Sequence, residues 1–431
     1  MRAGCANWKL RVAWCFLLVL ALLSPVHLRA ANEPASGIRS GAGGIVMWNP
    51  ITRDCRKLSE IRKELQSGNR FVTEKVAELQ RTADKLLIRP LRSVMDKPFL
   101  PPSGDKHDYF SLATYYWPDT HSTNGLPYVS RDGKTNPEGK DYDNTSLGRM
   151  CEAVHTLSFA YCLTGKENYA VRAVEQIRAW YLDEETRMHP SLKYAQVIKG
   201  IQTNSPFGII DTRPMLKVVD AVTLLRESAA WRTEDNVKLQ GWFCSYLDWL
   251  ITSEQGCRAA EYDNNQGTWY DVQTVRYALF VGKNTKAREI VEAAKSRRIA
   301  KQIEPDGRQP RELSRSKSFT YSVSNLGAMI RLAALGEQLG VNLWDYRSPD
   351  GRSIRRAVNY LAPFVDPVKV WPFKQIEKVD RKEMLKPLLE EAALHSNPVV
   401  KPQNASNVQA GSRASAADNG SPPSTSAARG L

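Results

Sequence analysis

The sequence has little that would hold a metal ion or lock the fold covalently. Its 431 residues include 6 histidines and 7 cysteines, and none of these form a cluster with metal-ligand spacing. We therefore expect no metal site and no cofactor. The cysteines beyond the N-terminal leader form an odd set without a CxxC pair, so an oxidising compartment would allow one or two disulfides whose pairing stays open. These are Cys55, Cys151, Cys162, Cys244 and Cys257.

The sequence also lacks an apolar run that spans a bilayer comfortably. The N-terminal run, 12–23, follows three basic residues and precedes the small pair Ala30 and Ala31. This is the pattern of a cleaved secretory leader, which we predict over residues 1–31. An uncleaved anchor is the alternative interpretation. We expect a secreted or periplasmic protein with no stable membrane insertion after cleavage.

Acidic residues are in deficit. Against 60 Lys and Arg there are 46 Asp and Glu, which gives a net charge of +14. Such a balance favours a polyanionic partner, which would be nucleic acid, anionic lipid or an acidic polysaccharide. Export argues against nucleic acid, so an acidic polysaccharide is the partner that we expect. The sequence does not fix the oligomeric state.

Strand signals are few, and most of the chain carries helical periodicity. Short connections between the expected helices are typical of antiparallel helix pairs, so we predict an all-α toroid or solenoid over residues 45–395. Residues 397–431 are rich in small and polar residues, and we expect a disordered tail. The expected helices cover 57–88, 146–163, 168–182, 215–226, 234–251, 268–281, 285–303 and 322–339.

One segment, 108–138, is rich in aromatic residues and is punctuated by proline and glycine, which predicts a loop. The aromatic residues either pack under the loop or provide flat surfaces for sugar rings. Because Tyr115, Tyr116 and Trp117 are consecutive, they cannot all face inward. At least one of them should be available to a ligand.

Three amides, Asn264, Asn265 and Gln266, lie just before an apolar helix. Side-chain amides and the free N–H groups of a helix N-terminus can donate hydrogen bonds to a carboxylate without adding a competing charge. The alternative is that the two asparagines only cap the helix.

A second cluster covers 304–321, where Arg308, Arg311, Arg315 and Lys317 precede Tyr321. A neighbouring guanidinium stabilises a phenolate, so we expect a lowered pKa that makes Tyr321 a usable proton carrier. The alternative is a solvated basic loop beside a core tyrosine. Carboxylate-binding amides and an activated tyrosine are together what proton abstraction beside a carboxylate requires.

The sequence resembles the alginate-lyase superfamily of polysaccharide lyases, whose fold is an incomplete (α/α) toroid. The resemblance extends over about 107–371 and includes separated blocks in the same order. These blocks are 107–119, 125–133, 180–183, 186–190, 194–196, 209–213, 264–273 and 304–321.

The resemblance implies cleavage of a uronic-acid polymer by elimination. Asn265 would hold the substrate carboxylate, Arg315 would lie beside the reacting tyrosine, and Tyr321 would be the catalytic acid and also the base. Gln266 would complete the catalytic group. Further substrate contacts are expected from Asn264, Tyr115, Trp117, Tyr194, Gln196, Arg213, Trp269 and Arg311.

The sequence departs from the family at Gln266, where relatives usually carry a histidine. Glutamine still forms hydrogen bonds but does not exchange a proton near neutral pH. In mannuronate and glucuronate the C5 hydrogen and O4 lie on the same side of the ring, so one tyrosine serves both steps. We therefore predict syn-elimination on these blocks and little action on guluronate. Alternatively, another histidine has taken over the role; the candidates are His107, His121, His155 and His189.

Two other function classes remain open at this point. A lyase scaffold inactivated by loss of the histidine would be a non-catalytic protein that binds acidic glycans. A hydrolase on a similar toroid would need two carboxylates at the site. Asp211, Glu261 and Asp263 are candidates, but their spacing does not single them out.

Overall fold

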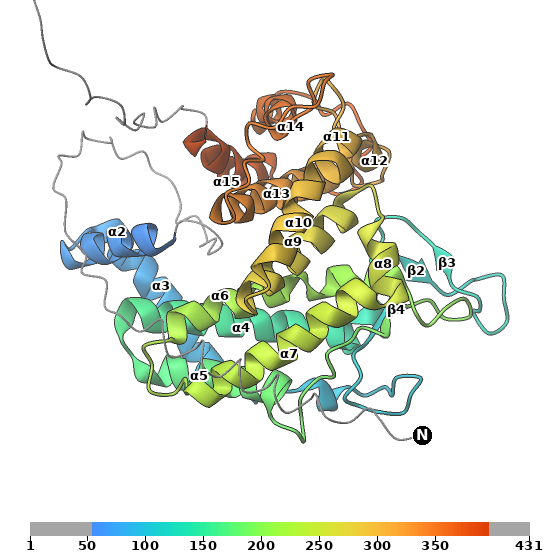
Figure 1. Cartoon of the computed structure of the whole chain (residues 1–431). Coiled ribbons are helices and arrows are strands. Elements are labelled where there is room, and N and C mark those ends of the chain that lie inside the picture. Colours follow the sequence, from blue (N-terminus) through green and yellow to red (C-terminus); the bar gives the residue numbers. More distant parts are fainter. Residues whose placement is uncertain (1–53, 396–431) are drawn as a thin grey trace, which may run out of the picture. The chain divides into compact units, whose positions relative to one another are not determined.

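A computed structural model describes residues 54–395, and these residues are mainly helical (Figure 1). The expected leader, 1–31, and the expected tail, 397–431, lie outside the described residues. The α-helices are α2 (Asp54–Gln66), α3 (Arg70–Leu87), α4 (Asp143–Thr164), α5 (Glu167–Ile177), α6 (Leu216–Leu225), α7 (Thr233–Thr252), α8 (Glu254–Ala260), α9 (Asn265–Phe280), α10 (Asn284–Ala294), α11 (Ala300–Gln302), α12 (Pro310–Leu313), α13 (Ser318–Gln338), α14 (Ile354–Leu361) and α15 (Arg381–Leu394).

Short 3-10 and π segments adjoin several helices. The 3-10 segments are η1 (Val94–Asp96), η2 (Pro137–Asp141), η4 (Pro206–Met215) and η6 (Ala362–Val365), and the π segments are η3 (Arg178–Leu182) and η5 (Lys295–Ile299).

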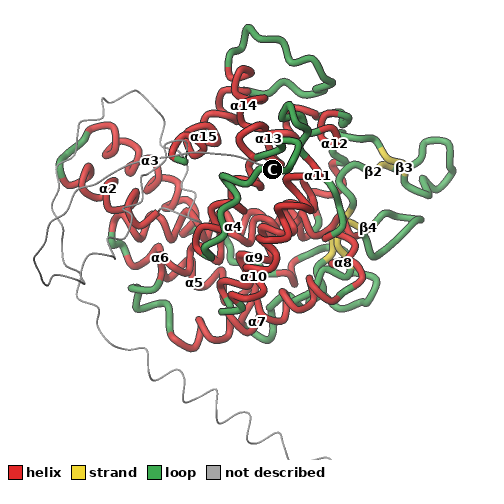
Figure 2. Tube along the Cα trace, turned by 45° about the horizontal axis from the view of Figure 1, so that its top comes forward, coloured by secondary structure: helices red, strands yellow, loops and turns green. Residues whose placement is uncertain are grey.

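Strands are few and short, as Figure 2 shows, and each pairs with one partner. β1 (Phe110–Leu112) pairs in parallel with β4 (Tyr194–Val197). β2 (Tyr116–Trp117) and β3 (Val129–Ser130) form an antiparallel hairpin. The aromatic segment 108–138 is therefore a long loop, as predicted, into which three short strands are set. The hairpin lies at the edge of the helical body in both ribbon views (Figures 1 and 2).

The helix predictions are close to the structure, with one clear correction. The expected helix 57–88 is two helices, α2 and α3. The chain turns between them because Gly68 has φ +74°, a left-handed conformation that favours glycine, and Asn69 then caps α3 through its side chain. At the end of α4, Gly165 adopts φ +70°, a left-handed conformation in which glycine commonly ends a helix.

Consecutive helices pack side by side because their connections are short. Only two residues, Gly165 and Lys166, separate α4 from α5, so the chain must reverse there. The contacts of α4 with α5 and α6, and of α9 with α10 and α13, enclose one large apolar core. Within it, Trp180 and Phe243 are fully buried. The antiparallel pairing expected from the sequence is thus present.

Some features are absent from the described part of the chain. No disulfide joins Cys151, Cys162, Cys244 and Cys257. Over residues 54–395 no helix combines the length and the apolar character that crossing a membrane requires. No group of histidine, cysteine and carboxylate side chains in this range is arranged to hold a metal ion.

The N-terminus of α9 is held in place by a buried arginine. Arg298 is only 1% exposed and pairs with Asp271 through two hydrogen bonds of 2.7 and 3.0 Å. The same guanidinium donates to the carbonyls of Ala260 and Tyr262, both at 2.7 Å. A buried charge is stable only when it is paired and hydrogen-bonded, so this side chain ties the turn before α9 to the body of that helix.

Buried amides continue this anchoring to α13. Gln302 accepts hydrogen bonds from Thr268 of α9 and from Asn325 of α13, both at 3.0 Å. Asn325 also donates to Gln309 at 2.8 Å. Buried hydrogen bonds of this kind fix the relative positions of the elements that they join. The starts of α9 and α13 therefore belong to one rigid group.

Substitution of Gly267 tests how closely Arg298 and the turn before α9 pack against the start of that helix. A Cβ at this position would lie 2.0 Å from the carbonyl oxygen of Tyr262 and 2.7 Å from Nη1 of Arg298. We expect Gly267→Ala to lower the free energy of unfolding by about 1–3 kcal/mol, as overpacking does. The control is Gly241→Ala, because Gly241 lies inside α7 with open space around its missing Cβ. That control should raise stability by about 0.5–1 kcal/mol. Denaturant titration measures both, and equal effects would contradict the proposed crowding.

Candidate active site

The first turn of α9 binds a buried carboxylate. Glu312 of α12 is 1% exposed and accepts hydrogen bonds from the backbone N–H of Asn265 at 2.5 Å and from its Nδ2 at 2.7 Å. Burial raises the pKa of Glu312 to about 7, although these hydrogen bonds and the charge of Arg315 oppose the shift. The contact fixes the orientation of the Asn265 amide and leaves its second N–H to donate elsewhere.

The two neighbouring amides have different roles. Asn264 is the N-cap of α9, and its side-chain oxygen accepts from the backbone N–H of Gln266 at 3.0 Å. The capping interpretation is therefore correct for Asn264. Gln266 is half-buried, and its Oε1 has no hydrogen-bond partner among residues 54–395. A polar atom left without a partner costs free energy, which a ligand or water in contact with it would offset.

Tyr321 lies in the first turn of α13, half-buried between an arginine and a second tyrosine. Its hydroxyl donates to the hydroxyl of Tyr115 at 2.6 Å. The guanidinium carbon of Arg315 lies 4.4 Å from the centroid of the Tyr321 ring. Lys317 is also near, with Nζ 5.7 Å from the ring of Tyr115. The aromatic loop and the basic cluster, far apart in the sequence, thus meet at one phenol.

The pKa of Tyr321 is not lowered, contrary to the expectation from sequence. Burial raises it well above the usual value, the hydrogen bond with Tyr115 adds to the shift, and the charge of Arg315 opposes both only in part. The arginine stacks on the face of the ring, where it contacts the π-system rather than the oxygen. Tyr321 is therefore a neutral acid at neutral pH.

Asp132 holds Arg315 in this position. The carboxylate accepts from Nη2 and Nε of Arg315 at 2.6 and 3.1 Å and from the backbone N–H of Ser316 at 2.9 Å. Although burial opposes it, these hydrogen bonds lower the pKa of Asp132 to about 2. Gly133, at φ +75°, permits the close approach, since a Cβ there would lie 2.3 Å from Oγ of Ser316.

A second pair of expected residues, Arg213 and Trp269, meets one turn further along α9 than Asn265. The guanidinium of Arg213 lies 4.8 Å from the ring centroid of Trp269, and Trp269 donates through Nε1 to Ser324 at 3.0 Å. Trp269 is buried and Arg213 is exposed.

Gln196 forms a separate group around Asp211. It has φ +46°, which is strained for a residue other than glycine, and its Nε2 donates to Asp211 at 2.7 Å. Ser111 and Tyr109 donate to the same carboxylate. Burial raises the pKa of Asp211 to about 6.

The structure does not bring the remaining expected residues into the Tyr321 group by any direct contact. Tyr194 is buried in a small apolar cluster with Phe110. Trp117 is half-buried and donates to the carbonyl of Lys134 at 2.9 Å. Arg311 is exposed and pairs with Asp263 at 3.0 Å.

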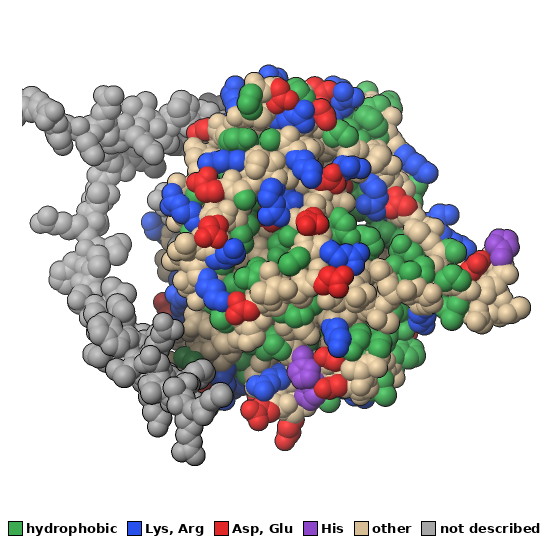
Figure 3. All heavy atoms as spheres, turned by 45° about the vertical axis from the view of Figure 1, so that its right-hand side comes forward, with side chains coloured by type: hydrophobic (Ala, Val, Ile, Leu, Met, Phe, Trp, Pro, Cys, Tyr) green, Lys and Arg blue, Asp and Glu red, His purple; other side chains and the backbone are tan. Residues whose placement is uncertain are grey.

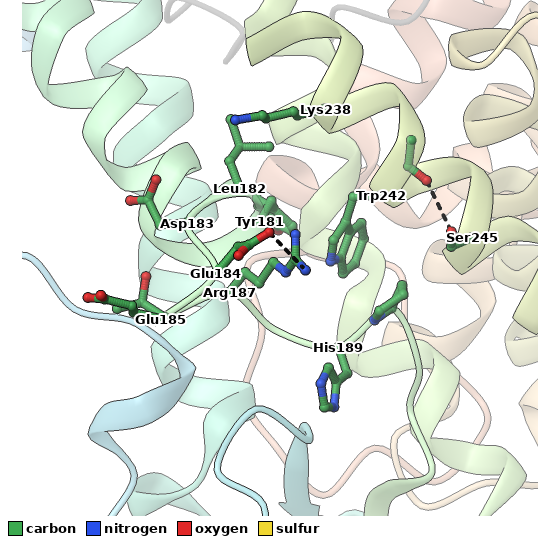
Figure 4. A pocket seen from close by; sticks show the side chains of 13 residues that line it. Tyr181, Leu182, Asp183, Glu184, Glu185, Arg187, His189, Lys238, Trp242 and Ser245 are labelled. Carbon is green, nitrogen blue, oxygen red and sulfur yellow. Dashed lines mark hydrogen bonds and ion pairs between the residues drawn. The ribbon is translucent and has the colours of Figure 1, made fainter. Parts of the chain in front are cut away.

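A pocket of about 750 Å³ lies elsewhere, between the turn after η3 and α7 (Figure 4). Its lining includes Asp183, Glu184 and Glu185, and it shares no residue with the Tyr321 group. Arg187 and Lys238 also line it, so acidic and basic side chains are mixed in this pocket. On the face displayed in Figure 3, basic and acidic side chains are interleaved, so the net positive charge does not gather there into a single patch.

Sequence reasoning missed two of the residues that organise the site. Asp132 and Glu312 lie inside the blocks 125–133 and 304–321 that carry the family resemblance. No local sequence pattern marks a carboxylate that will be buried beside an arginine. Only the fold shows that Glu312 reaches Asn265, which is 47 positions away in the chain.

Comparison with known proteins shows the family and the fold. The alginate lyase family model matches residues 93–371. A crystal structure of an alginate lyase from Bacteroides ovatus superposes with a TM-score of 0.77 and 36% sequence identity, covering 80% of this chain and 91% of that one. Alginate lyase A1-III from Sphingomonas species A1 matches with a TM-score of 0.42 and 16% identity, covering 67% of this chain and 77% of that chain. A search of curated proteins gives no significant match.

The match to the Bacteroides enzyme covers most of both chains, so the two share a fold. The all-α, incomplete (α/α) toroid predicted from the sequence is confirmed. The family match extends over more than half of the chain and includes the Asn265, Glu312, Arg315 and Tyr321 group. The chain belongs to the alginate lyase family of polysaccharide lyases.

Proposed function

We propose that the protein cleaves mannuronate or glucuronate blocks of an acidic polysaccharide by syn β-elimination, with Tyr321 as base and acid. The observation that supports this most directly is the grouping of Asn265 and Tyr321 around two charged side chains. Asn265 hydrogen-bonds to Glu312, the charge of Arg315 acts on Glu312, and Arg315 stacks on the ring of Tyr321. The grouping joins a carboxylate-binding amide to a proton carrier. The family assignment favours a lyase over a hydrolase that uses Asp211, Glu261 or Asp263.

In the proposed reaction, the free N–H of Asn265 and the side chain of Gln266 bind the substrate carboxylate. Their hydrogen bonds stabilise the charge that develops on it as the C5 proton leaves. The helix N-terminus of α9 adds partial positive charge at the same place. The carboxylate binds close to Glu312, so it disfavours ionisation of Glu312, whose pKa is already about 7.

The phenolate of Tyr321 takes the C5 proton in this scheme. The C4–O4 bond then breaks, a C4–C5 double bond forms, and the same proton passes from Tyr321 to the departing O4. The phenolate is thereby regenerated, so the cycle balances without a second proton carrier. Tyr115 accepts the hydrogen bond of the resting phenol and provides the route by which its proton first leaves. The positive charges of Arg315 and Lys317 stabilise the phenolate.

Export is part of the proposal and rests on the sequence alone. The basic and apolar pattern of residues 1–31 is that of a secretory leader. An acidic polysaccharide outside the cytoplasm would then be the substrate, in keeping with the net charge of +14.

Removal of the phenol hydroxyl tests the central role. We expect Tyr321→Phe to lower kcat at least about a thousandfold, because both proton transfers use this oxygen. Tyr346→Phe is the control, since Tyr346 is a half-buried tyrosine on the connection between α13 and α14. Product is followed by the absorbance of the new C4–C5 double bond. A wild-type protein that binds uronate polymers without any turnover would instead identify the non-catalytic glycan-binding alternative.

The raised pKa of Tyr321 predicts an alkaline rate profile. A raised pKa leaves the phenol protonated at neutral pH, so the active phenolate increases as the pH rises. We expect kcat at saturating substrate to rise about tenfold per pH unit above about pH 8, because kcat follows the phenolate in the enzyme–substrate complex, whereas ionisation of Glu312 in the free enzyme weakens binding and raises KM. Arg315→Gln should move this rise to higher pH. A profile that is flat from about pH 7 to 9 would show that no phenolate is needed.

Substrate stereochemistry gives a further test. A single proton carrier reaches C5 and O4 only when both lie on the same side of the ring. We expect mannuronate or glucuronate blocks to be cleaved at least about tenfold faster than guluronate blocks of equal length, a difference of about 1.4 kcal/mol in activation free energy. Rates on the purified blocks, each read from the unsaturated ends, decide this. Preferential cleavage of guluronate would require a second proton carrier and would refute the role of Gln266.

A further inference from the structure

Two arginines share one indole ring near the proposed site. The guanidinium carbons of Arg213, from η4, and Arg331, from α13, lie 4.8 and 5.2 Å from the ring centroid of Trp269. Each contact is a cation–π interaction. The sequence had suggested Arg213 and Trp269 as substrate contacts but had not suggested Arg331, which lies alone in an apolar stretch of helix.

Neither guanidinium has a carboxylate partner among residues 54–395. Asp220 is close enough to act on the pKa of Arg331, but both of its hydrogen bonds of 3.0 and 2.7 Å come from Arg276. No hydrogen bond within the described chain engages the donors of Arg213 or Arg331. Each guanidinium carries five N–H donors, so many donors here are left for a ligand or for water.

The two charges repel each other. Burial and the charge of Arg213 lower the pKa of Arg331 to about 10, and surrounding protein lowers the pKa of Arg213. Solvent nevertheless reaches both side chains, since Arg213 is exposed and Arg331 is partly exposed. Like charges held together without a counter-ion destabilise a protein, and a bound anion would relieve that cost.

The proposed catalytic tyrosine and Arg331 lie on the same side of α13, and the positions between Ser324 and Arg331 are all buried. From Ser318 to Arg331, the positions that are not buried are Thr320, Tyr321, Ser324 and Arg331. Tyr321, Ser324 and Arg331 lie on one face at helical spacing, about 15 Å from end to end. Trp269 contacts this side of α13 at Ser324 and Arg331, and it follows Asn265 by one turn of α9.

We propose that Arg213 and Arg331, supported on Trp269, form a binding site for a second carboxylate of the same polyuronate chain. Planar guanidinium groups match a carboxylate through paired hydrogen bonds, and two of them with no acidic partner select for an anion over a neutral sugar. The site rests on the proposed function for the identity of its ligand. It would set the register of the polymer by holding one sugar while another is presented to Tyr321.

Binding without turnover tests the site. Calorimetry with a purified mannuronate hexasaccharide would be carried out on full-length protein carrying Tyr321→Phe, with and without Arg331→Gln. We expect Arg331→Gln to weaken binding by about tenfold or more, the usual loss for a charged hydrogen-bonded group. The matched control is Arg70→Gln, because Arg70 is a highly exposed surface arginine and the change in net charge is the same. That control should leave affinity within about twofold.

A structural role for Arg331 would give different results. If the arginine only packs on Trp269, then Arg331→Gln would lower the melting temperature of the ligand-free protein and leave the affinity unchanged, which would overturn the proposal. The account instead predicts an unchanged or raised melting temperature, since a repulsion is removed. Equal binding of a carboxyl-reduced hexasaccharide would also overturn it. Because no step needs catalysis, these results stand even if turnover measurements refute the role of Tyr321.

Discussion

The hydrogen bonds between buried Glu312 and the first turn of α9 are the constraint on which the proposed chemistry depends. They join α12 to the amide of Asn265, at 2.7 Å, and they place a carboxylate within electrostatic reach of Arg315. Two further hydrogen bonds fix the same region: Arg298 donates to the carbonyl of Tyr262, and Thr268 donates to Gln302. Because Glu312 is buried and binds both the backbone N–H and Nδ2 of Asn265, the amide is presented in one orientation, which is what preorganised stabilisation of a developing charge requires.

The surroundings of the Tyr321 phenol oppose its ionisation. Burial makes Tyr321 a weak acid. Arg315 stacks on the phenol ring while it donates hydrogen bonds to Asp132. The basic side chains therefore do not activate the phenol in advance; they lower the cost of forming the phenolate. Raised pKa values at Tyr321 and Glu312 within one contact network are typical of functional sites.

Sequence reasoning recovered the fold well because helical periodicity and capping are local. Gly165 and Asn264 act at their helix ends as their residue types predict. Residue types pointed to Asn265, Arg315 and Tyr321, and the family resemblance gave each its expected role. The hydrogen bond from Asn265 to Glu312 and the stacking of Arg315 on Tyr321 appear only in the structure. What could not be obtained from sequence is what depends on three-dimensional surroundings. The sign of the Tyr321 pKa shift was wrong because burial was not visible, and Glu312 and Arg331 carry no local signal of their partners.

The most direct measurement is a crystal structure of the Tyr321→Phe protein with a bound uronate oligosaccharide. The account predicts that one sugar carboxylate accepts hydrogen bonds from Nδ2 of Asn265, with the C5 hydrogen and O4 of that sugar both facing the ring of residue 321. A carboxylate bound away from Asn265, or a C5 hydrogen directed to the opposite side, would contradict it.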